Sequence, residues 1–257
     1  MLRPRIIPSL LMQNGGLVKT VKFSNPKYVG DPINAVRIFN EKEVDELVFL
    51  DIDATAQRRE PDYALIASIA GECRMPLCYG GGIKTVEQVE MIVSLGVEKV
   101  AIGSAAIDTP GLIAEAAARV GNQSIVAVMD VKKTGVLKRY ELFTHNGGRK
   151  TGVAPVDFAR KVQEEGAGEI LVNVIDKDGT MSGYDIALAC ELREATHIPM
   201  SILGGAGNME DIEELFRNCG VVGAAAGSMF VFKGKYKAVL IQYPDQGERE
   251  KIYDRLG

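Results

Sequence analysis

The feature that most constrains the fold of this chain is an internal repeat of glycine-rich turns. The run Gly80-Gly81-Gly82-Ile83 is followed by Gly103-Ser104, 23 residues after its first glycine. The run Gly204-Gly205-Ala206-Gly207 is followed by Gly227-Ser228 at the same spacing. The two copies are offset by 124 residues, close to half of the 257-residue chain. Self-similarity of this kind predicts two related structural halves.

Other residues recur at almost the same offset. Three pairs are separated by 123 residues: Glu46 with Glu169, Asp53 with Asp176, and Pro76 with Pro199. No linker or shift in composition separates the two copies. We therefore expect one domain over residues 1–257, made of halves at about 1–122 and 123–257.

Short apolar runs alternate with amphipathic segments along the whole chain. Eight runs resemble buried strands, at residues 6–12, 46–51, 76–79, 99–102, 125–130, 169–174, 199–203 and 223–226. Helix-like patterns fall at residues 85–95, 110–119, 154–165, 184–195 and 209–217. Buried strands that alternate with helices indicate a parallel sheet with covered faces. Eight such units at this length predict an α/β fold, a (βα)₈ TIM barrel of two fused (βα)₄ halves.

Composition excludes several classes of function. A net charge of -4 argues against nucleic-acid binding, which needs a basic surface. The apolar run near the N-terminus is too short to span a membrane, and no cleavage-site pattern follows it. We expect a cytoplasmic protein without a nucleic-acid or membrane partner.

The metal-binding residue types are sparse and badly spaced. The four cysteines form no C-x-x-C pair, and the chain has only two histidines. The acidic stretch at residues 176–180 lacks the spacing of a calcium loop. We expect no metal and no cofactor.

The glycine pairs are candidate phosphate sites. Glycine lets the backbone approach a ligand closely, and the N–H groups of such turns can form an anion site near a helix N-terminus. Turns after the seventh and eighth strands are common phosphate sites in barrels. The repeat then places a second site in the first half. The two predicted sites suit an elongated bisphosphate and comprise Gly81, Gly82, Gly103 and Ser104, and Gly204, Gly205, Ala226, Gly227 and Ser228.

Carboxylates and lysines also gather near the predicted rim. Five aspartates follow the ends of strands: Asp51, Asp53, Asp130, Asp176 and Asp178. Each could transfer protons, or it could cap a helix or hold a loop. Residues 13–28 read as a long loop that carries Lys19, Lys22 and Lys27. A loop of this length is often a lid, and its lysines could reach a phosphate.

Motifs over nearly the whole chain resemble those of the HisF family, the cyclase subunit of imidazole glycerol phosphate synthase. The resemblance lies in Arg5-Ile-Ile-Pro, Leu17-Val-Lys-Thr-Val-Lys-Phe, Gly30-Asp-Pro, Asp45-Glu-Leu-Val-Phe-Leu-Asp51, Tyr79-Gly-Gly-Gly-Ile83, Gly168-Glu-Ile, Ile175-Asp-Lys-Asp-Gly-Thr180, Gly204-Gly-Ala-Gly207 and Ala225-Ala-Gly-Ser228. It implies a lyase subunit of histidine biosynthesis. Such subunits take ammonia from a HisH-type glutaminase at the N-terminal face and add it to a bisphosphorylated precursor.

The resemblance also assigns roles to individual residues. It implies an ammonia entrance made of Arg5, Glu46, Lys99 and Glu169, with Glu98 at the glutaminase interface. Asp130 matches the catalytic aspartate of the fifth barrel strand. Lys19, Asp51 and Asp178 match further residues on the substrate side.

The chain departs from the family pattern where the chemistry should occur. Leu11 stands where the resemblance expects the first-strand catalytic aspartate, and the internal repeat pairs it with Asp130. Three further departures lie nearby: Gly103 for an asparagine, Leu203 for a serine, and Cys78 for a threonine. Leucine cannot transfer a proton, whereas general acid–base catalysis contributes about 10²–10⁴-fold. Cyclase activity is therefore in doubt.

Three interpretations remain open. The first is a subunit specialised to deliver ammonia to a third enzyme that amidates a sugar in surface-polysaccharide (lipopolysaccharide) synthesis. The second is an ordinary imidazole glycerol phosphate synthase cyclase. The third is a scaffold that activates the glutaminase and catalyses nothing itself.

Overall fold

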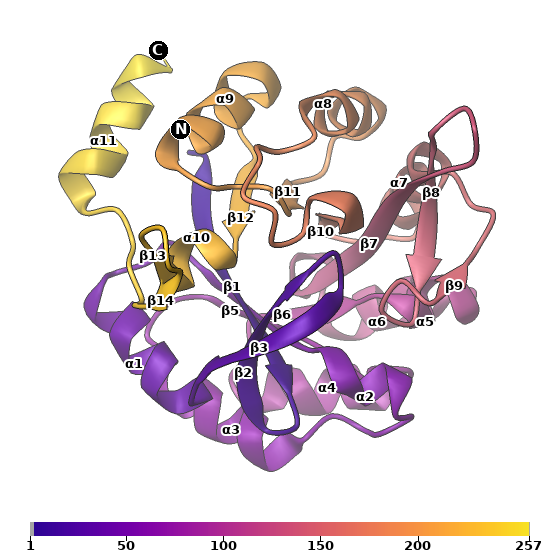
Figure 1. The fold of residues 1–257 in the computed structure, drawn as a ribbon. Helices are drawn as coiled ribbons and strands as arrows, with labels where there is room; N and C mark the ends of the chain where they lie inside the picture. The colour runs from indigo at the N-terminus through magenta and orange to yellow at the C-terminus, as the bar shows by residue number, and fades with distance from the viewer. Residues whose placement is uncertain (1–2, 257) are drawn as a thin grey trace.

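A computed structural model describes residues 3–256 of the chain, and these form one closed barrel with helices outside it (Figure 1). Neighbouring barrel strands are parallel, and the ring closes where β12 pairs with β1. In order around the ring, the strands are β1 (Arg5–Gln13), β4 (Leu47–Asp51), β5 (Leu77–Gly80), β6 (Lys99–Ile102), β7 (Ile125–Thr134), β10 (Glu169–Val174), β11 (Met200–Leu203) and β12 (Gly223–Ala226). This confirms the predicted (βα)₈ barrel. The domain boundaries given above stay a prediction.

The longer helices cover the outside of the barrel. They are α1 (Pro32–Glu41), α3 (Tyr63–Glu72), α4 (Val86–Ser94), α6 (Leu112–Val120), α7 (Pro155–Glu164), α8 (Ile186–Ala195), α9 (Met209–Cys219) and α11 (Gln246–Arg255). Helix α4 is capped by Thr85, whose side chain forms a reciprocal capping box with Gln88. Helix α9 has the same device, between Asn208 and Asp211. The repeat thus includes the signals that start matching helices.

Short helices follow several strands at the C-terminal end of the barrel, here called the rim. They are α2 (Ile52–Ala56), α5 (Ser104–Asp108), α10 (Ser228–Val231) and the 3₁₀ turn η2 (Ile175–Lys177), while the 3₁₀ turn η1 (Asn122–Ser124) precedes β7. Helices α5 and α10 each start directly after a repeated glycine, Gly103 or Gly227. Their first N–H groups therefore lie beside the candidate phosphate sites.

Antiparallel strands add hairpins above the rim. They are β2 (Gly16–Val21) with β3 (Ser24–Gly30), β8 (Arg139–Thr144) with β9 (Arg149–Lys150), and β13 (Phe232–Lys233) with β14 (Ala238–Val239). The prediction of an irregular loop at residues 13–28 is wrong, because this segment pairs with β1 and with itself. Charged and polar residues in that segment hide its strand pattern.

Two apolar layers hold the fold together. The larger one packs the outward-facing side chains of the strands against the helices, as with Phe39, Phe49 and Phe216. The smaller one fills the interior of the barrel and includes Val48, Leu171 and six neighbours from other strands. Within residues 3–256 no helix is long and apolar enough to cross a membrane.

Candidate functional site

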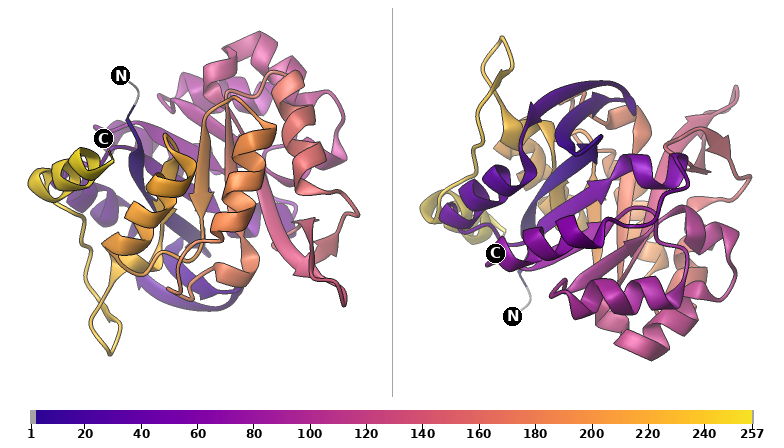
Figure 2. Two further views of the ribbon diagram at one scale, coloured as in Figure 1. Left: turned by 90° about the horizontal axis from the view of Figure 1, so that it is seen from above. Right: turned by 90° about the horizontal axis from the view of Figure 1, so that it is seen from below.

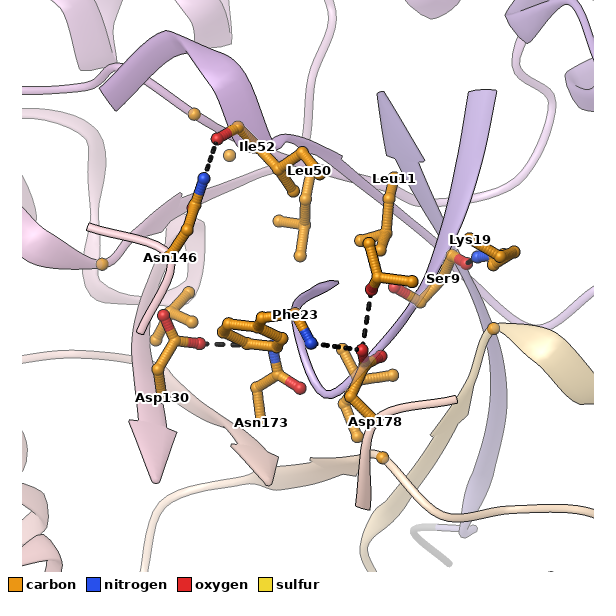
Figure 3. Close-up of a pocket in the computed structure, with 18 of the residues that line it drawn as sticks. Ser9, Leu11, Lys19, Phe23, Leu50, Ile52, Asp130, Asn146, Asn173 and Asp178 are labelled. Carbon is orange, nitrogen blue, oxygen red and sulfur yellow. Dashed lines mark hydrogen bonds between the residues drawn. The ribbon is translucent and has the colours of Figure 1, made fainter. Parts of the chain in front are cut away.

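A cavity of about 190 Å³ opens at the rim of the barrel, as expected for this fold. Residues from both halves line it, including the glycine turns after β5, β6, β11 and β12. The structure therefore brings together all of the predicted phosphate-side residues and all four predicted substrate-side groups, Lys19, Asp51, Asp130 and Asp178. Figure 3 shows the arrangement.

Asp130 is the carboxylate best placed for proton transfer. It lies on β7 beside Asn173 of β10, whose amide Nδ2 donates a hydrogen bond of 3.2 Å to Asp130 Oδ1. Burial raises the pKa of Asp130 to about 7. The hydrogen bond from Asn173 opposes this shift, and the charge of Asp178 contributes a smaller increase. At neutral pH such a group can both donate and accept a proton.

The opposite side of the mouth has no carboxylate in the matching position. Leu11 of β1 lies in register with Leu50 of β4, and both side chains face the cavity (Figure 3). Val128 and Leu203 also line the cavity. This surface can exclude water but has no proton to transfer.

The other four aspartates hold the backbone in place. Asp51 caps α2 by accepting from the N–H groups of Asp53 and Ala54, and it pairs with Arg59 at 3.4 Å. Its pKa is raised by burial, although Arg59 opposes the shift. The remaining contacts anchor loops: Asp53 accepts from Gln13 and the Asn14 N–H, Asp176 from the Lys133 N–H, and Asp178 from Thr20 and the Phe23 N–H.

Most of the repeated glycines are required by packing within the protein. A Cβ on Gly81 would lie 2.5 Å from the Asp51 carbonyl oxygen, and one on Gly204 would lie 2.8 Å from that of Val174. Both have positive φ, at 132° and 102°. Glycine is therefore required at these positions by the preceding strand–helix connection as well as by the approach of a ligand. Gly103 differs, since a Cβ would meet nothing closer than Val128 at 3.7 Å.

Lys19 lies beneath the candidate phosphate site of the second half, at Gly227. It is buried on β2, and its ammonium donates to the Ser9 carbonyl oxygen. Burial lowers the pKa of Lys19 to about 8, with partial compensation from the charge of Asp178. A Cβ on Gly227 would lie 2.7 Å from Lys19 Nζ, so this cation already sits against the glycine turn.

Two flaps meet above the cavity. The turn between β2 and β3 places Phe23 over the mouth (Figure 3). The turn between β8 and β9 brings Asn146, which donates to the Ile52 carbonyl oxygen across the mouth, and His145, whose N–H donates to Ser104. A Cβ on Gly147 would come within 3.4 Å of the Phe23 ring, so the two flaps lie beside each other.

A ring of four charges closes the opposite end of the barrel. Arg5 contacts both Glu46 and Glu169, at 2.7 Å to the latter, and Lys99 Nζ lies 2.8 Å from each of the same carboxylates. Ser201 also donates to Glu169 at 2.5 Å. Burial by itself would raise the pKa of Glu169, but the charges of Arg5 and Lys99 outweigh it and hold this pKa below its usual value.

Comparison with known proteins agrees with this geometry. The family model described as "Histidine biosynthesis protein" matches residues 5–237. A Leptospira interrogans protein named "Putative imidazole glycerol phosphate synthase subunit HisF" is 55% identical over 253 residues, covering 98% of this chain and 100% of the relative. The chain belongs to the HisF family.

Two further HisF relatives are of similar closeness. One from Vibrio vulnificus, given the same name with the symbol hisF3, is 56% identical over 99% of this chain and 98% of its own length. One from Pseudomonas aeruginosa, with the symbol hisF2, is 53% identical over 95% of this chain and 97% of its own length.

The two remaining residues that the HisF resemblance singles out lie near the ring, Cys78 on its inner side and Glu98 just before Lys99. Cys78 lies just inside the ring with Val48, Val126 and Leu171, in a space of about 10 Å³. Glu98 is exposed, and its carboxylate accepts from the Leu77 N–H at 2.8 Å, which fixes the start of β5. The interior of this HisF barrel is thus apolar above a charged ring.

Some residues of the site escaped the sequence prediction. Asn173 is a polar residue inside a buried strand, and it stands 123 residues after Leu50, so the repeat could have identified it. Its Oδ1 and the Ser9 hydroxyl are buried without a hydrogen-bond partner among residues 3–256. Ser9 and Asn173 both line the cavity, so each residue carries a polar atom without a partner beside it. Asn146 gave no sequence signal of its own, and Phe23 entered only as the last residue of the motif at residues 17–23.

Proposed function

We propose that this chain receives ammonia from a HisH-type glutaminase at its N-terminal face and delivers it through the barrel to another enzyme. The charged ring of Arg5, Glu46, Lys99 and Glu169 would be the entrance, and Glu98 would contact the glutaminase. The apolar layer above the ring suits a neutral molecule, because an ion there would lose its hydration without gaining partners.

The observation that carries this proposal is the pairing of Leu11 with Leu50 at the rim. A cyclase needs proton transfer on both sides of its substrate, and the resemblance expects an aspartate at position 11. Asp51 and Asp53 hold a helix and a loop with their carboxylates, Asp176 and Asp178 each anchor a loop through one carboxylate oxygen, and none of the four stands at position 11. Asp130 is left as the proposed catalytic residue for any chemistry at this rim.

The proposed acceptor is a sugar-amidating enzyme of surface-polysaccharide synthesis, and the chain would act in the cytoplasm. The symbols hisF2 and hisF3 of two relatives support specialisation, because such numbering is given to one of several copies. A small bisphosphorylated ligand would still bind at the glycine turns, with Lys19 beneath one phosphate.

An ordinary cyclase is the second candidate, favoured by one observation. Because the pKa of Asp130 is raised to about 7, this residue could serve in turn as acid and base. The relatives are also named for imidazole glycerol phosphate synthase.

Cyclisation and glutaminase coupling distinguish the candidates. The purified chain with ammonia and the bisphosphorylated precursor should form no imidazole glycerol phosphate under our proposal. Turnover within about tenfold of an active HisF would contradict it. With the cognate glutaminase, Lys99→Ala should reduce ammonia transfer to an acceptor, while Lys84→Ala, at an exposed rim position, should not. If neither variant changes transfer, the role of the ring as an entrance is wrong.

A further inference from the structure

Exposed apolar side chains gather on the hairpins of the rim. Val136 and Leu137, between β7 and β8, are 100% and 75% exposed, and Tyr236, between β13 and β14, is 90% exposed. Val21 and Tyr28 of the β2–β3 hairpin are also exposed. Large apolar side chains held in water on one face commonly mark an interaction site.

The two outer hairpins also carry unbalanced positive charge. Residues 132–139 read Lys-Lys-Thr-Gly-Val-Leu-Lys-Arg, and residues 232–239 read Phe-Lys-Gly-Lys-Tyr-Lys-Ala-Val. Neither segment contains an aspartate or glutamate, although the whole chain has a net charge of -4. We call these two segments the rim prongs.

Both prongs extend beyond the body of the barrel on the same side, from different parts of the rim (Figure 2). One is the continuation of β7, so its tip at Val136 lies six residues beyond Asp130. The strand itself continues four residues beyond Asp130, to Thr134, which is roughly 13 Å at about 3.3 Å per residue. The mouth of the cavity thus lies at the base of this prong.

The other prong is attached to the candidate phosphate site of the second half, at Gly227 and Ser228. It continues directly from α10, which starts at Ser228, and the Leu240 N–H donates to the Val231 carbonyl oxygen at 2.9 Å. Gln242 holds its base through the carbonyl oxygens of Met229 and Phe232. Lys27 of the β2–β3 flap lies over the Phe232 ring and donates to the Lys237 carbonyl oxygen. A protein bound to this prong would therefore contact the flap as well.

We propose that the rim prongs form the docking surface for an ammonia-consuming enzyme whose facing surface is acidic, with apolar recesses for Leu137 and Tyr236. This inference rests on the proposed delivery function. Ammonia that has crossed the barrel must leave at the mouth, and a partner held by both prongs would cover that exit. Complementary charge would orient the partner, and the buried apolar tips would provide most of the affinity.

A protein fits these observations better than a lipid surface or a nucleic acid. A lipid surface would bury only three apolar side chains at the two tips and would leave no acceptor at the mouth. Nucleic acid would use the lysines but not the aliphatic tips.

The first experiment places a photo-crosslinking amino acid at Val136, at Tyr236 or at Met91, an exposed position on α4. After irradiation in the source organism, both prong positions should capture the same ammonia-consuming enzyme, and Met91 should not. Capture of lipid or nucleic acid, no capture at the prongs, or capture only at Met91 would overturn the proposal.

The second experiment reconstitutes the chain with its glutaminase and the captured enzyme. Leu137→Asp and Tyr236→Asp should each lower glutamine-dependent product formation at least tenfold, and Met91→Asp should not. With added ammonium as the nitrogen source, all variants should give the wild-type rate, because the acceptor itself is unchanged.

Wild-type transfer that persists in both prong variants would refute docking and leave the delivery function standing. Wild-type protein that never supports glutamine-dependent transfer, despite crosslinks at both prongs, would refute the delivery function instead. Glutaminase binding, measured separately, should be the same for every variant.

Discussion

The two halves of the rim share a backbone but differ in what their side chains can do. On one side Leu11 is paired with Leu50, and on the other Asp130 is paired with Asn173. Both halves keep the glycine turns and the short helices that follow them. The comparison shows that close packing of the connections preserves the turns, while side chains that face the cavity are free to diverge.

Placing a carboxylate at position 11, in the half of the rim that carries Leu11 and Leu50, should have the largest effect on activity. We expect Leu11→Asp to raise cyclisation of the bisphosphorylated precursor with ammonia by at least about 100-fold, because general acid–base catalysis is worth about 10²–10⁴-fold. Leu11→Asn is the control, since it is polar but transfers no proton. No gain from the aspartate would direct attention to Gly103 and Leu203, and would show that the halves differ in more than one group.

The half of the rim that carries Asp130 should make the free energy of unfolding depend on pH. The pKa of Asp130 is raised to about 7, so the folded protein holds a proton that the unfolded chain releases near pH 4. The free energy of unfolding should therefore fall as the pH rises from about 4 to about 7, by up to about 4 kcal/mol.

Asp130→Asn removes this titration. The variant should equal the wild type at pH 4 and exceed it at pH 8, as measured by urea unfolding at both values. If the free energy of unfolding differs between variant and wild type by the same amount at pH 4 and pH 8, Asp130 is ionised and solvated in the folded protein. The two halves of the rim would then be less different than the geometry indicates.

The charged ring joins the two halves, since Glu46 and Glu169 are repeat partners. Lys99→Ala leaves these carboxylates with Arg5 as their only cation in the ring. Removing one partner of a buried ion pair costs about 3–5 kcal/mol, and partial exposure of Lys99 reduces our expectation to about 1–3 kcal/mol. Adding Glu46→Gln should restore part of the loss in thermal unfolding. A further loss would mean that the carboxylates do not repel each other.

The smallest expected difference concerns the two serines of the glycine turns. Ser104 accepts a hydrogen bond from the His145 N–H at 3.1 Å, while Ser228 makes no side-chain hydrogen bond among residues 3–256. Ser104→Ala should lower the free energy of unfolding by about 1 kcal/mol, and Ser228→Ala by less than about 0.5 kcal/mol. If chemical denaturation gives the same loss of unfolding free energy for both variants, the hydrogen bond between His145 and Ser104 contributes little.

The barrel strands could be predicted because their apolar runs are nearly unbroken. The bounds of β6, β10 and β12 agree with the sequence to the residue. The hairpins at the rim could not be predicted. Their strands contain many polar and charged residues, so the sequence does not show that they pair with β1 and β7.

The site could be predicted only in part, for a related reason. Asp130 was found because it ends a predicted strand at the rim. The loop-anchoring roles of Asp53 and Asp178 depend on N–H groups of Asn14 and Phe23, which are distant in sequence. A sequence pattern shows where a carboxylate lies along the chain but not which donor will meet it.

The two flaps lie beside each other at Phe23 and Gly147, and this has a kinetic consequence. One flap continues from a strand of each half, so a ligand that fills the cavity would leave freely only after both had moved. Because neighbouring flaps hinder each other's movement, the fraction of time with both open would be small. Association and dissociation would then slow by the same factor, and affinity would stay unchanged. Such a site keeps what it holds for long periods without binding it tightly.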